Sequence, residues 1–373
     1  MIKQPQTPSV KYFGPYEDYS GYGEANRNYI SALFTAGVDV NCELIKLSSD
    51  PRVDHGASID MVRKAEKCKV PYAVKILHVT PDLYFKNMEE RKYNIGHLFW
   101  ETKQLPPEWR WYCDQMQELW VDSADTMHWL ARSGIRPTIS HFPQPIDTEI
   151  KVPEPFDIGF KGYLFYSIFE WKERKNPRAL LETFYKEFDG VSDVALLIKT
   201  YRDDYGLASK TMILEELRKI KQDLNLKNPP KVFYLNQLLN KTDMWRIHAT
   251  GDCFVSTHRG EGWGLPQVEA MLMGKPIIST NRGGVHNYLP DVLAYLISYK
   301  EVLIDKVYDK YYAPPQTWAE IDRKELAEAM RHAYTKREFA KKMGERAREF
   351  VKSNFSYKAV GEKMKQRLIE IGA

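Results

Sequence analysis

The sequence predicts an α/β protein made of two doubly wound domains. Its 373 residues exceed the roughly 250–300 that a single hydrophobic core usually organises, so two or three domains are expected. Short apolar runs alternate with longer helical patterns along most of the chain, which is typical of βαβ units around a parallel sheet. A proline-rich segment, residues 143–155, interrupts this alternation and predicts a linker between the domains.

The composition is that of an ordinary globular protein: 43% of the residues are hydrophobic, 28% are charged and the formal net charge is +4. These values exclude disordered, collagen-like and disulfide-scaffold proteins. The first residues contain no apolar stretch of the kind found in a secretory signal, and no apolar run reaches the ~18 residues of a membrane span. The four cysteines form no Cys-x-x-Cys pair, so reduced thiols and a cytoplasmic location are expected.

The N-terminal domain is expected to span residues 1–150. Its first strand leads through a glycine-containing loop into a helix that ends before Gly37, and three further strands follow. In chain order the predicted elements are the strand Val10–Phe13, the loop Gly14–Gly23, the helix Glu24–Ala36 and the strands Val38–Ile45, Tyr72–Val79 and Glu118–Val121.

The same alternation restarts after the linker and predicts a C-terminal domain over residues 151–345. Helices are expected from Asp322 to Ile371, with a break near Ser353–Ser356, and the last of them, residues 346–373, is expected to pack on the N-terminal domain. The other predicted elements are the helices Pro177–Phe188 and Lys210–Leu224 and the strands Gly162–Phe169, Val194–Lys199, Val232–Leu235, Cys253–Ser256 and Pro276–Ser279.

The last helices are strongly basic. Between Arg331 and Arg367, twelve Lys and Arg residues stand against four Glu residues. Two interpretations stay open: a solvated helix face, or a surface that makes peripheral contact with a membrane or with nucleic acid.

The segment Asp252–Gly284 carries the clearest chemical signal. A strand leads into a loop that holds His258, Arg259 and Glu261, and glycines flank the entry to the next helix. Backbone N–H groups at such a helix start bind phosphate, and in an open α/β sheet the loop lies where ligands bind. The carboxylates of Glu261 and of Glu269 can accept hydrogen bonds from hydroxyl groups. The segment therefore predicts a site for a phosphate joined to a polyhydroxyl group; the alternative is a first-turn acid beside ordinary turn glycines.

These residues resemble a known family. The Glu-x(7)-Glu signature of retaining glycosyltransferases, in particular glycosyltransferase family 4, is similar to Glu261-Gly262-Trp263-Gly264-Leu265-Pro266-x-x-Glu269-Ala270-Met271. Further stretches match in order and spacing: Gly21-Tyr22-Gly23, Trp100-Glu101-Thr102, Pro143-x-Pro145-Ile146-Asp147 and Arg174-Lys175-Asn176-Pro177. The resemblance implies the GT-B fold, in which two Rossmann-like domains face each other across a cleft and C-terminal helices complete the structure.

The resemblance also implies roles for single residues. Lys175 would stabilise the diphosphate as the leaving group gains charge, Glu261 would hold the donor sugar, and Glu269 would bind the ribose hydroxyls. The implied catalytic residues are Lys175, Glu261, Arg259 and His78. The implied donor-binding residues are Gly21, Gly23, Arg174, His258, Gly262, Trp263, Gly264, Leu265 and Glu269.

Two positions depart from the family's pattern. Phe169 stands where many members have an arginine, and Arg174, Lys172 or Arg259 could supply the second positive charge. His78 lies two residues before the place of the family's histidine, so it is either a donor contact or an ordinary core histidine.

The implied function is a retaining glycosyltransferase that moves a hexose from a UDP- or GDP-sugar to a hydroxyl of a glycan or a lipid-linked glycan. The nucleotide sugar is then a co-substrate, and no cofactor or metal is expected, because the chain has no Asp-x-Asp triplet to hold a divalent ion. Two alternatives stay open: a glycosyltransferase acting on a modified DNA base, and a non-catalytic sugar-nucleotide-binding protein. A nicotinamide-dependent oxidoreductase is disfavoured, because the Gly21-Tyr22-Gly23 stretch lacks the third glycine of that motif.

Overall fold

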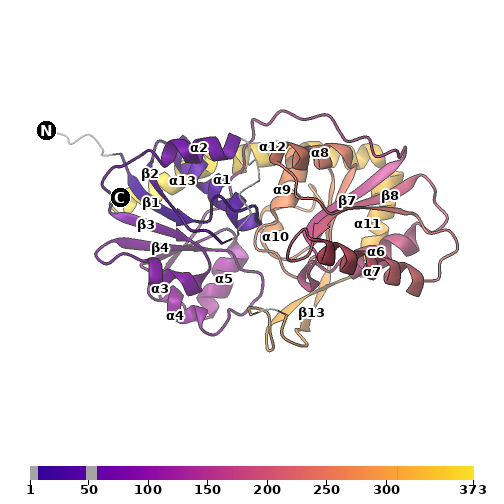
Figure 1. The fold of residues 1–373 in the computed structure, drawn as a ribbon, viewed down its shortest axis with the longest axis horizontal. Helices are drawn as coiled ribbons and strands as arrows, with labels where there is room; N and C mark the ends of the chain where they lie inside the picture. Colours follow the sequence, from indigo (N-terminus) through magenta and orange to yellow (C-terminus); the bar gives the residue numbers. More distant parts are fainter. Residues whose placement is uncertain (1–6, 48–56, 309) are drawn as a thin grey trace. The chain divides into compact units, whose positions relative to one another are not determined.

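The computed structural model describes residues 7–47, 57–308 and 310–373. The chain divides into two compact units: residues 1–150 with 352–373 form unit 1, and residues 151–351 form unit 2. A six-stranded sheet with flanking helices forms the centre of each unit (Figure 1). The predicted α/β class with two doubly wound sheets is confirmed.

The sheet of unit 1 is parallel and has the strand order β2-β1-β3-β4-β5-β6. The direction of winding reverses between β1 and β3, and ligands bind at such switch points, beyond the carboxyl ends of the strands. The strands are β1 (Ser9–Gly14), β2 (Asp39–Leu44), β3 (Val74–His78), β4 (Tyr93–Leu98), β5 (Glu118–Val121) and β6 (Thr138–His141). The helices are α1 (Gly21–Thr35), α2 (Ala57–Ala65), η1 (Pro81–Leu83), α3 (Tyr84–Asn87), α4 (Trp109–Cys113), α5 (Ala124–Arg132) and α13 (Tyr357–Glu370).

Helix α1 begins at Gly21, so the expected start at Glu24 and the expected length of the preceding loop are wrong. Ser20 caps the helix, because its hydroxyl accepts a hydrogen bond from the N–H of Gly23 at 3.3 Å. A Cβ on Gly23 would lie 2.1 Å from the carbonyl oxygen of Asp18, whereas a Cβ on Gly21 would have no neighbour within 4 Å. The close approach of the backbone therefore requires glycine only at Gly23.

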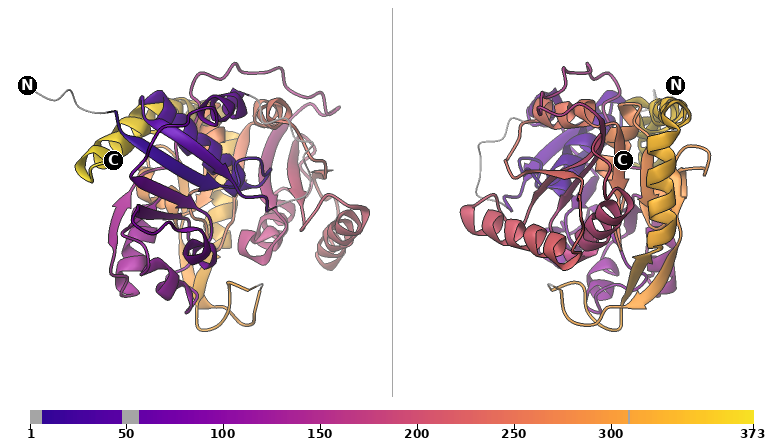
Figure 2. Two further views of the ribbon diagram at one scale, coloured as in Figure 1. Left: turned by 60° about the vertical axis from the view of Figure 1, so that its left-hand side comes forward. Right: turned by 90° about the vertical axis from the view of Figure 1, so that its right-hand side faces the viewer.

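The C-terminal helix α13 packs on α1 (yellow in Figure 2). A Cβ on Gly361 would lie 2.2 Å from the carbonyl oxygen of Ala32, so the two helix backbones are in close contact. Arg367 of α13 binds the fully buried carboxylate of Glu118, with 2.9 Å between Nη2 and Oε2. The predicted break before α13 is confirmed: Ser356 caps the helix, and its hydroxyl accepts from an N–H three residues later.

The main sheet of unit 2 is also parallel, with the strand order β12-β11-β10-β7-β8-β9. A separate antiparallel pair, β13 with β14, was not predicted from the sequence. The strands are β7 (Tyr163–Glu170), β8 (Val194–Tyr201), β9 (Lys231–Leu235), β10 (Cys253–Ser256), β11 (Ile277–Thr280), β12 (Tyr295–Ile297), β13 (Tyr299–Leu303) and β14 (Thr317–Ile321). The helices are η2 (Glu173–Lys175), α6 (Pro177–Glu187), α7 (Leu207–Asp223), α8 (Lys241–Thr250), α9 (Leu265–Leu272), α10 (Gly284–Tyr288), α11 (Arg323–Thr335) and α12 (Arg337–Phe355), the last of which ends in unit 1.

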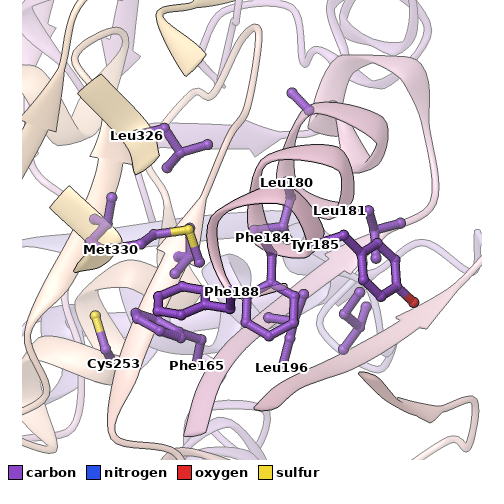
Figure 3. Close-up of a cluster of buried hydrophobic side chains, with 14 of the residues drawn as sticks. Phe165, Leu180, Leu181, Phe184, Tyr185, Phe188, Leu196, Cys253, Leu326 and Met330 are labelled. Carbon is purple, nitrogen blue, oxygen red and sulfur yellow. The ribbon is translucent and has the colours of Figure 1, made fainter. Parts of the chain in front are cut away.

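The core of unit 2 forms where α6 and α11 pack on the sheet (Figure 3). Leu180 and Phe184 of α6 and Phe188, the residue that follows it, recur every four residues, so they share the buried face. They meet Phe165 of β7 and Met330 of α11. Burying a large apolar side chain contributes about 1.5–3 kcal/mol, so this cluster fixes the strands whose carboxyl ends carry the site.

Part of the basic charge of the last helices is used within the fold. Besides Arg367, five basic side chains donate hydrogen bonds within their own unit. The pairs are Arg331 with Glu187, Arg337 with Asp193, Arg346 with Val292, Arg348 with Met273 and Lys365 with Ala36. Their guanidinium and ammonium groups anchor the helices to the unit on which each lies. None of the described helices is both long enough and apolar enough to cross a bilayer.

Candidate functional site

The candidate site lies at the switch point of the unit 2 sheet. Strand β10 pairs with β7, although β8 and β9 come between them in the chain. The loop after β7 carries Lys175 and the loop after β10 carries Glu261, so the fold brings together two motifs that are far apart in sequence. Carboxyl ends of parallel strands at such a reversal are where open α/β sheets bind ligands.

The loop after β7 is a single turn of 3-10 helix that ends at Asn176. Asn176 takes a left-handed conformation with φ 52°, and Pro177 then starts α6, where its missing N–H costs nothing. The hydroxyl of Thr257 donates to the carbonyl of Asn176 at 3.0 Å, and the N–H of Arg259 donates to the carbonyl of Arg174 at 2.7 Å. These bonds fasten the two loops to each other.

The loop before α9 depends on glycines from two segments. Gly264 precedes α9 with φ 90°, which only glycine adopts without strain. Gly283 also has a positive φ, and a Cβ added to it would lie 2.0 Å from the carbonyl oxygen of Glu261. The N–H of Gly284 donates to that oxygen at 3.3 Å. No role was predicted for Gly283 and Gly284 from the sequence; a glycine pair shortly after a strand was the signal that could have indicated them.

Lys175 donates a hydrogen bond to Glu261 Oε2, and both side chains are mostly buried. Burial by itself would raise the pKa of Glu261, but the positive charges of Lys175 and Arg174 hold this pKa at about 2. Arg174 also donates to the carbonyl of Gly260 at 2.8 Å. The site therefore contains an ionised carboxylate and two cations in a partly desolvated environment.

Glu269 sits in the first turns of α9 and is 5% exposed. Lys241 donates to its Oε1 at 2.7 Å, and His248 Nε2 lies 3.3 Å from its Oε2. Burial lowers the pKa of His248, although the carboxylate of Glu269 acts in the opposite direction. Lys241 and His248 were not predicted as site residues; with Trp245 they share one face of α8, and this spacing was the available signal.

Arg259 and His258 precede Glu261 in the loop after β10, but their side chains bind partners other than Lys175 and Glu261. Arg259 forms ion pairs with Glu173 and with Glu320, the latter at 2.7 Å. His258 is fully buried; its Nε2 lies 2.9 Å from the carbonyl oxygen of Arg282, and burial lowers its pKa to about 4. A neutral His258 thus connects the loop after β10 to the loop after β11.

The candidates from the other predicted domain lie in unit 1. His78 ends β3 and Gly21 and Gly23 start α1, so all three stand at the carboxyl ends of β1 and β3. His78 is fully buried, its Nδ1 lies 2.6 Å from the hydroxyl of Tyr12, and its ring stacks on His97 with 4.0 Å between centroids. Burial lowers the pKa of His78 well below its ordinary value.

The described part of the chain contains no group of three or more His, Cys, Asp or Glu side chains arranged to hold a metal ion. The cationic side chains that pair with acceptors of the candidate site are Lys175, Arg174 and Lys241.

Comparison with known proteins gives a family match over part of the chain and a fold. Residues 212–350, which include Glu261 and Glu269, match the glycosyl transferases group 1 family. No curated protein matches the chain.

Several solved structures are similar over nearly the whole chain. Alr3699/HepE from Anabaena, in complex with UDP and glucose, has a TM-score of 0.68 and 12% identity, covering 97% of this chain and 100% of its own. Sucrose-phosphate synthase from Thermosynechococcus elongatus has a TM-score of 0.68 and 15% identity over 98% and 99%. The pneumococcal O-GlcNAc transferase GtfA, in complex with UDP and GlcNAc, has a TM-score of 0.64 and 10% identity over 98% and 99%. The predicted GT-B fold is confirmed.

Proposed function

We propose, from the GT-B fold and the group 1 match over residues 212–350, that the protein is a glycosyltransferase that uses a sugar nucleotide as donor. The observation that carries this proposal is the Lys175–Glu261 ion pair, because it gathers a cation and an ionised acid at the switch point of the sheet. Unit 2 is proposed to bind the donor, and unit 1, residues 1–150 with the C-terminal helix, to bind the acceptor. We further propose a cytoplasmic enzyme.

The proposed donor is a UDP-hexose. Supporting this choice, HepE and GtfA are structures in complex with UDP and a sugar, and a second HepE structure is in complex with UDP-glucose. Glu269 is proposed to accept hydrogen bonds from the ribose hydroxyls. Its carboxylate is already oriented by Lys241 and His248, so little side-chain entropy is lost when the ribose binds.

The diphosphate is proposed to lie between the start of α9 and the cations of the β7 loop. N–H groups at a helix start and the helix dipole favour an anion there. Lys175 and Arg174 then stabilise the negative charge that develops on the leaving phosphate, so no metal ion or cofactor is needed for this step. Removing one contact of this kind typically costs 10²–10³ in rate, or about 3–4 kcal/mol.

The transfer is proposed to retain the anomeric configuration. The acceptor hydroxyl attacks the anomeric carbon from the face that the phosphate leaves, and the leaving phosphate takes the proton of that hydroxyl. The acceptor is proposed to be a glycan or a lipid-linked glycan.

The test is proton NMR of the first-formed product with UDP-glucose and a panel of glycan acceptors. Retention is expected as an α-linked product from the α-configured donor, with one UDP released per bond formed. An inverted anomer would refute the retaining mechanism. Donor binding without any UDP release across the panel would instead favour the non-catalytic sugar-nucleotide-binding protein, and transfer only to a modified base in duplex DNA would favour that acceptor.

A further inference from the structure

The antiparallel pair β13–β14, here called the ribbon (residues 299–303 and 317–321), contacts the loops of the candidate site from outside the six-stranded sheet. Val302 pairs with Trp318, and the ribbon connects β12 to α11. It is coloured orange in Figure 1, where β13 is labelled. Two of its glutamates bind arginines that belong to the loops of the candidate site.

The first contact joins β14 to the loop after β10. Glu320 Oε2 accepts from Arg259 Nε at 3.0 Å and from Arg259 Nη2 at 2.7 Å, and the guanidinium lies over the ring of Trp318, 5.0 Å from its centroid. The backbone is bound as well, because the N–H of Ala319 donates to the carbonyl of Arg259 at 2.8 Å. Arg259 in turn donates its own N–H to the carbonyl of Arg174, so the ribbon, the β10 loop and the β7 loop are linked in series.

The second contact joins β13 to the loop after β11. Arg282 is 1% exposed; its Nη1 donates to Glu301 Oε1 at 2.6 Å, and its guanidinium lies 5.5 Å from the centroid of the Tyr299 ring. Two residues after Arg282, the N–H of Gly284 donates to the carbonyl of Glu261 at 3.3 Å. The carbonyl of Arg282 also lies 2.9 Å from His258 Nε2.

The contacts reach both partners of the Lys175–Glu261 ion pair. One runs from Glu320 through Arg259 to the β7 loop with Lys175. The other runs from Glu301 through Arg282 and the N–H of Gly284 to the backbone of Glu261. Arg282 is buried and Arg259 is mostly buried, while Glu301 and Glu320 are partly exposed. Each arginine keeps its glutamate because a largely buried charge without a partner would be uncompensated.

We propose that Glu320 and Glu301 are positioning residues: the ribbon uses them to hold the β7 and β10 loops so that Lys175 and Glu261 stay in register. Glu320 and Glu301 do not touch the substrate. The consequence for turnover rests on the proposed function, whereas the consequence for the loops does not. A displacement of about 1 Å in a catalytic group costs up to about 10²-fold in rate, so the ribbon acts on kcat through geometry.

The test compares Glu320→Gln with Glu187→Gln, which breaks the Arg331–Glu187 ion pair away from the ribbon. Hydrogen exchange by mass spectrometry should become faster in the peptides covering 173–176 and 258–264 in Glu320→Gln, and unchanged there in Glu187→Gln. Turnover of UDP-glucose should show kcat lowered roughly 10- to 100-fold with the donor KM within about threefold of wild type, since the ground-state contacts persist. Glu301→Gln is a second variant, with faster exchange expected at 261–264 and 282–284.

Wild-type exchange rates in those peptides of a folded Glu320→Gln protein would overturn the positioning role, whatever the enzyme's activity. An increase in donor KM without a loss of kcat would overturn it as well. A wild-type protein that turns over no donor would refute the proposed function, and the exchange comparison would still decide the role of the ribbon.

Discussion

Lys175 and Glu261 are 86 residues apart in the chain, and their side chains form a mostly buried ion pair at the carboxyl ends of β7 and β10. Each residue is supported by its own loop, and Thr257 and Arg259 bond the two loops together. The proposed stabilisation of the leaving phosphate depends on this ion pair.

Replacing Lys175 by alanine should lower kcat about 10²–10³-fold, because one of the cations that stabilises the leaving phosphate is lost. The folded state should persist, since Arg174 still compensates the charge of Glu261. Lys186→Ala, an exposed change on α6, is the matched control and should behave as wild type. Steady-state UDP release measures both variants, and full turnover by Lys175→Ala would contradict the assignment.

Replacing Glu269 by glutamine should weaken donor binding more than it changes the fold. The wild-type protein at a UDP-glucose concentration 100 times its Kd should gain about 2.7 kcal/mol of stability, visible as a higher Tm. Glu269→Gln should lose most of this shift, because a carboxylate accepts from two ribose hydroxyls better than a neutral amide does. The exposed Glu328→Gln, on α11, should keep it. An equal Tm shift in both variants would show that Glu269 does not bind the donor.

Protonation of His97 should destabilise unit 1 in acid. Its ring is fully buried, and burial lowers its pKa in the folded state from an ordinary 6.5 to about 3. As the pH falls, the unfolded chain therefore binds this proton at a higher pH than the folded protein does. The contribution of neutral His97 to the free energy of unfolding is complete above pH 6.5 and is lost as the pH falls from there toward 3. At pH 5 this loss amounts to about 2 kcal/mol.

His97→Phe removes that proton while keeping an aromatic ring in the cluster, so denaturation curves at pH 7.5 and pH 5 should differ by about 2 kcal/mol less than those of wild type. His128→Asn, at an exposed position of α5, should leave the acid dependence unchanged. An identical pH dependence in His97→Phe and wild type would mean that His97 is not protonated on unfolding in this range.

Replacing Arg367 by methionine should lower the free energy of unfolding by about 3 kcal/mol, because the fully buried Glu118 would lose its counter-charge. The double variant with Glu118→Gln should recover part of the loss, since a neutral amide can still accept from Trp120 Nε1, which donates to Glu118 Oε1 at 2.9 Å. Urea denaturation measures both. A double variant no more stable than Arg367→Met would show that packing of α13, rather than the charge pair, carries the effect.

Local features of this protein were largely predictable from its sequence. The strand runs around Phe165 and Val255 and the helix break before Tyr357 follow from apolar patterning and capping residues, whose effects extend over a few neighbours. The start of α1 was missed because a serine cap satisfies a first turn that contains two glycines. The ribbon was missed because its strands alternate weakly and are separated by a long aromatic loop.

The candidate site likewise contains residues that a motif indicates and residues that only the tertiary structure brings to it. Glu261, Glu269 and Lys175 were predicted as candidates from the motif, together with their neighbours in the chain. Lys241, His248 and Gly283 were not found, because each acts on a residue that lies 20 or more positions away in the chain. Arg259 was assigned to catalysis, and its ion pairs with Glu173 and Glu320 could be seen only once the ribbon was placed.

By itself the sequence determined the α/β class, the two-sheet organisation and the segment that holds the Glu-x(7)-Glu pattern, since these depend on periodicity and on spacing along one stretch of chain. Only the tertiary structure decided which cation meets which carboxylate. The physical reason is that strand order, which places β10 against β7, is fixed by packing summed over a whole sheet, and Coulomb and hydrogen-bond energies act between atoms a few ångströms apart regardless of their distance in the chain.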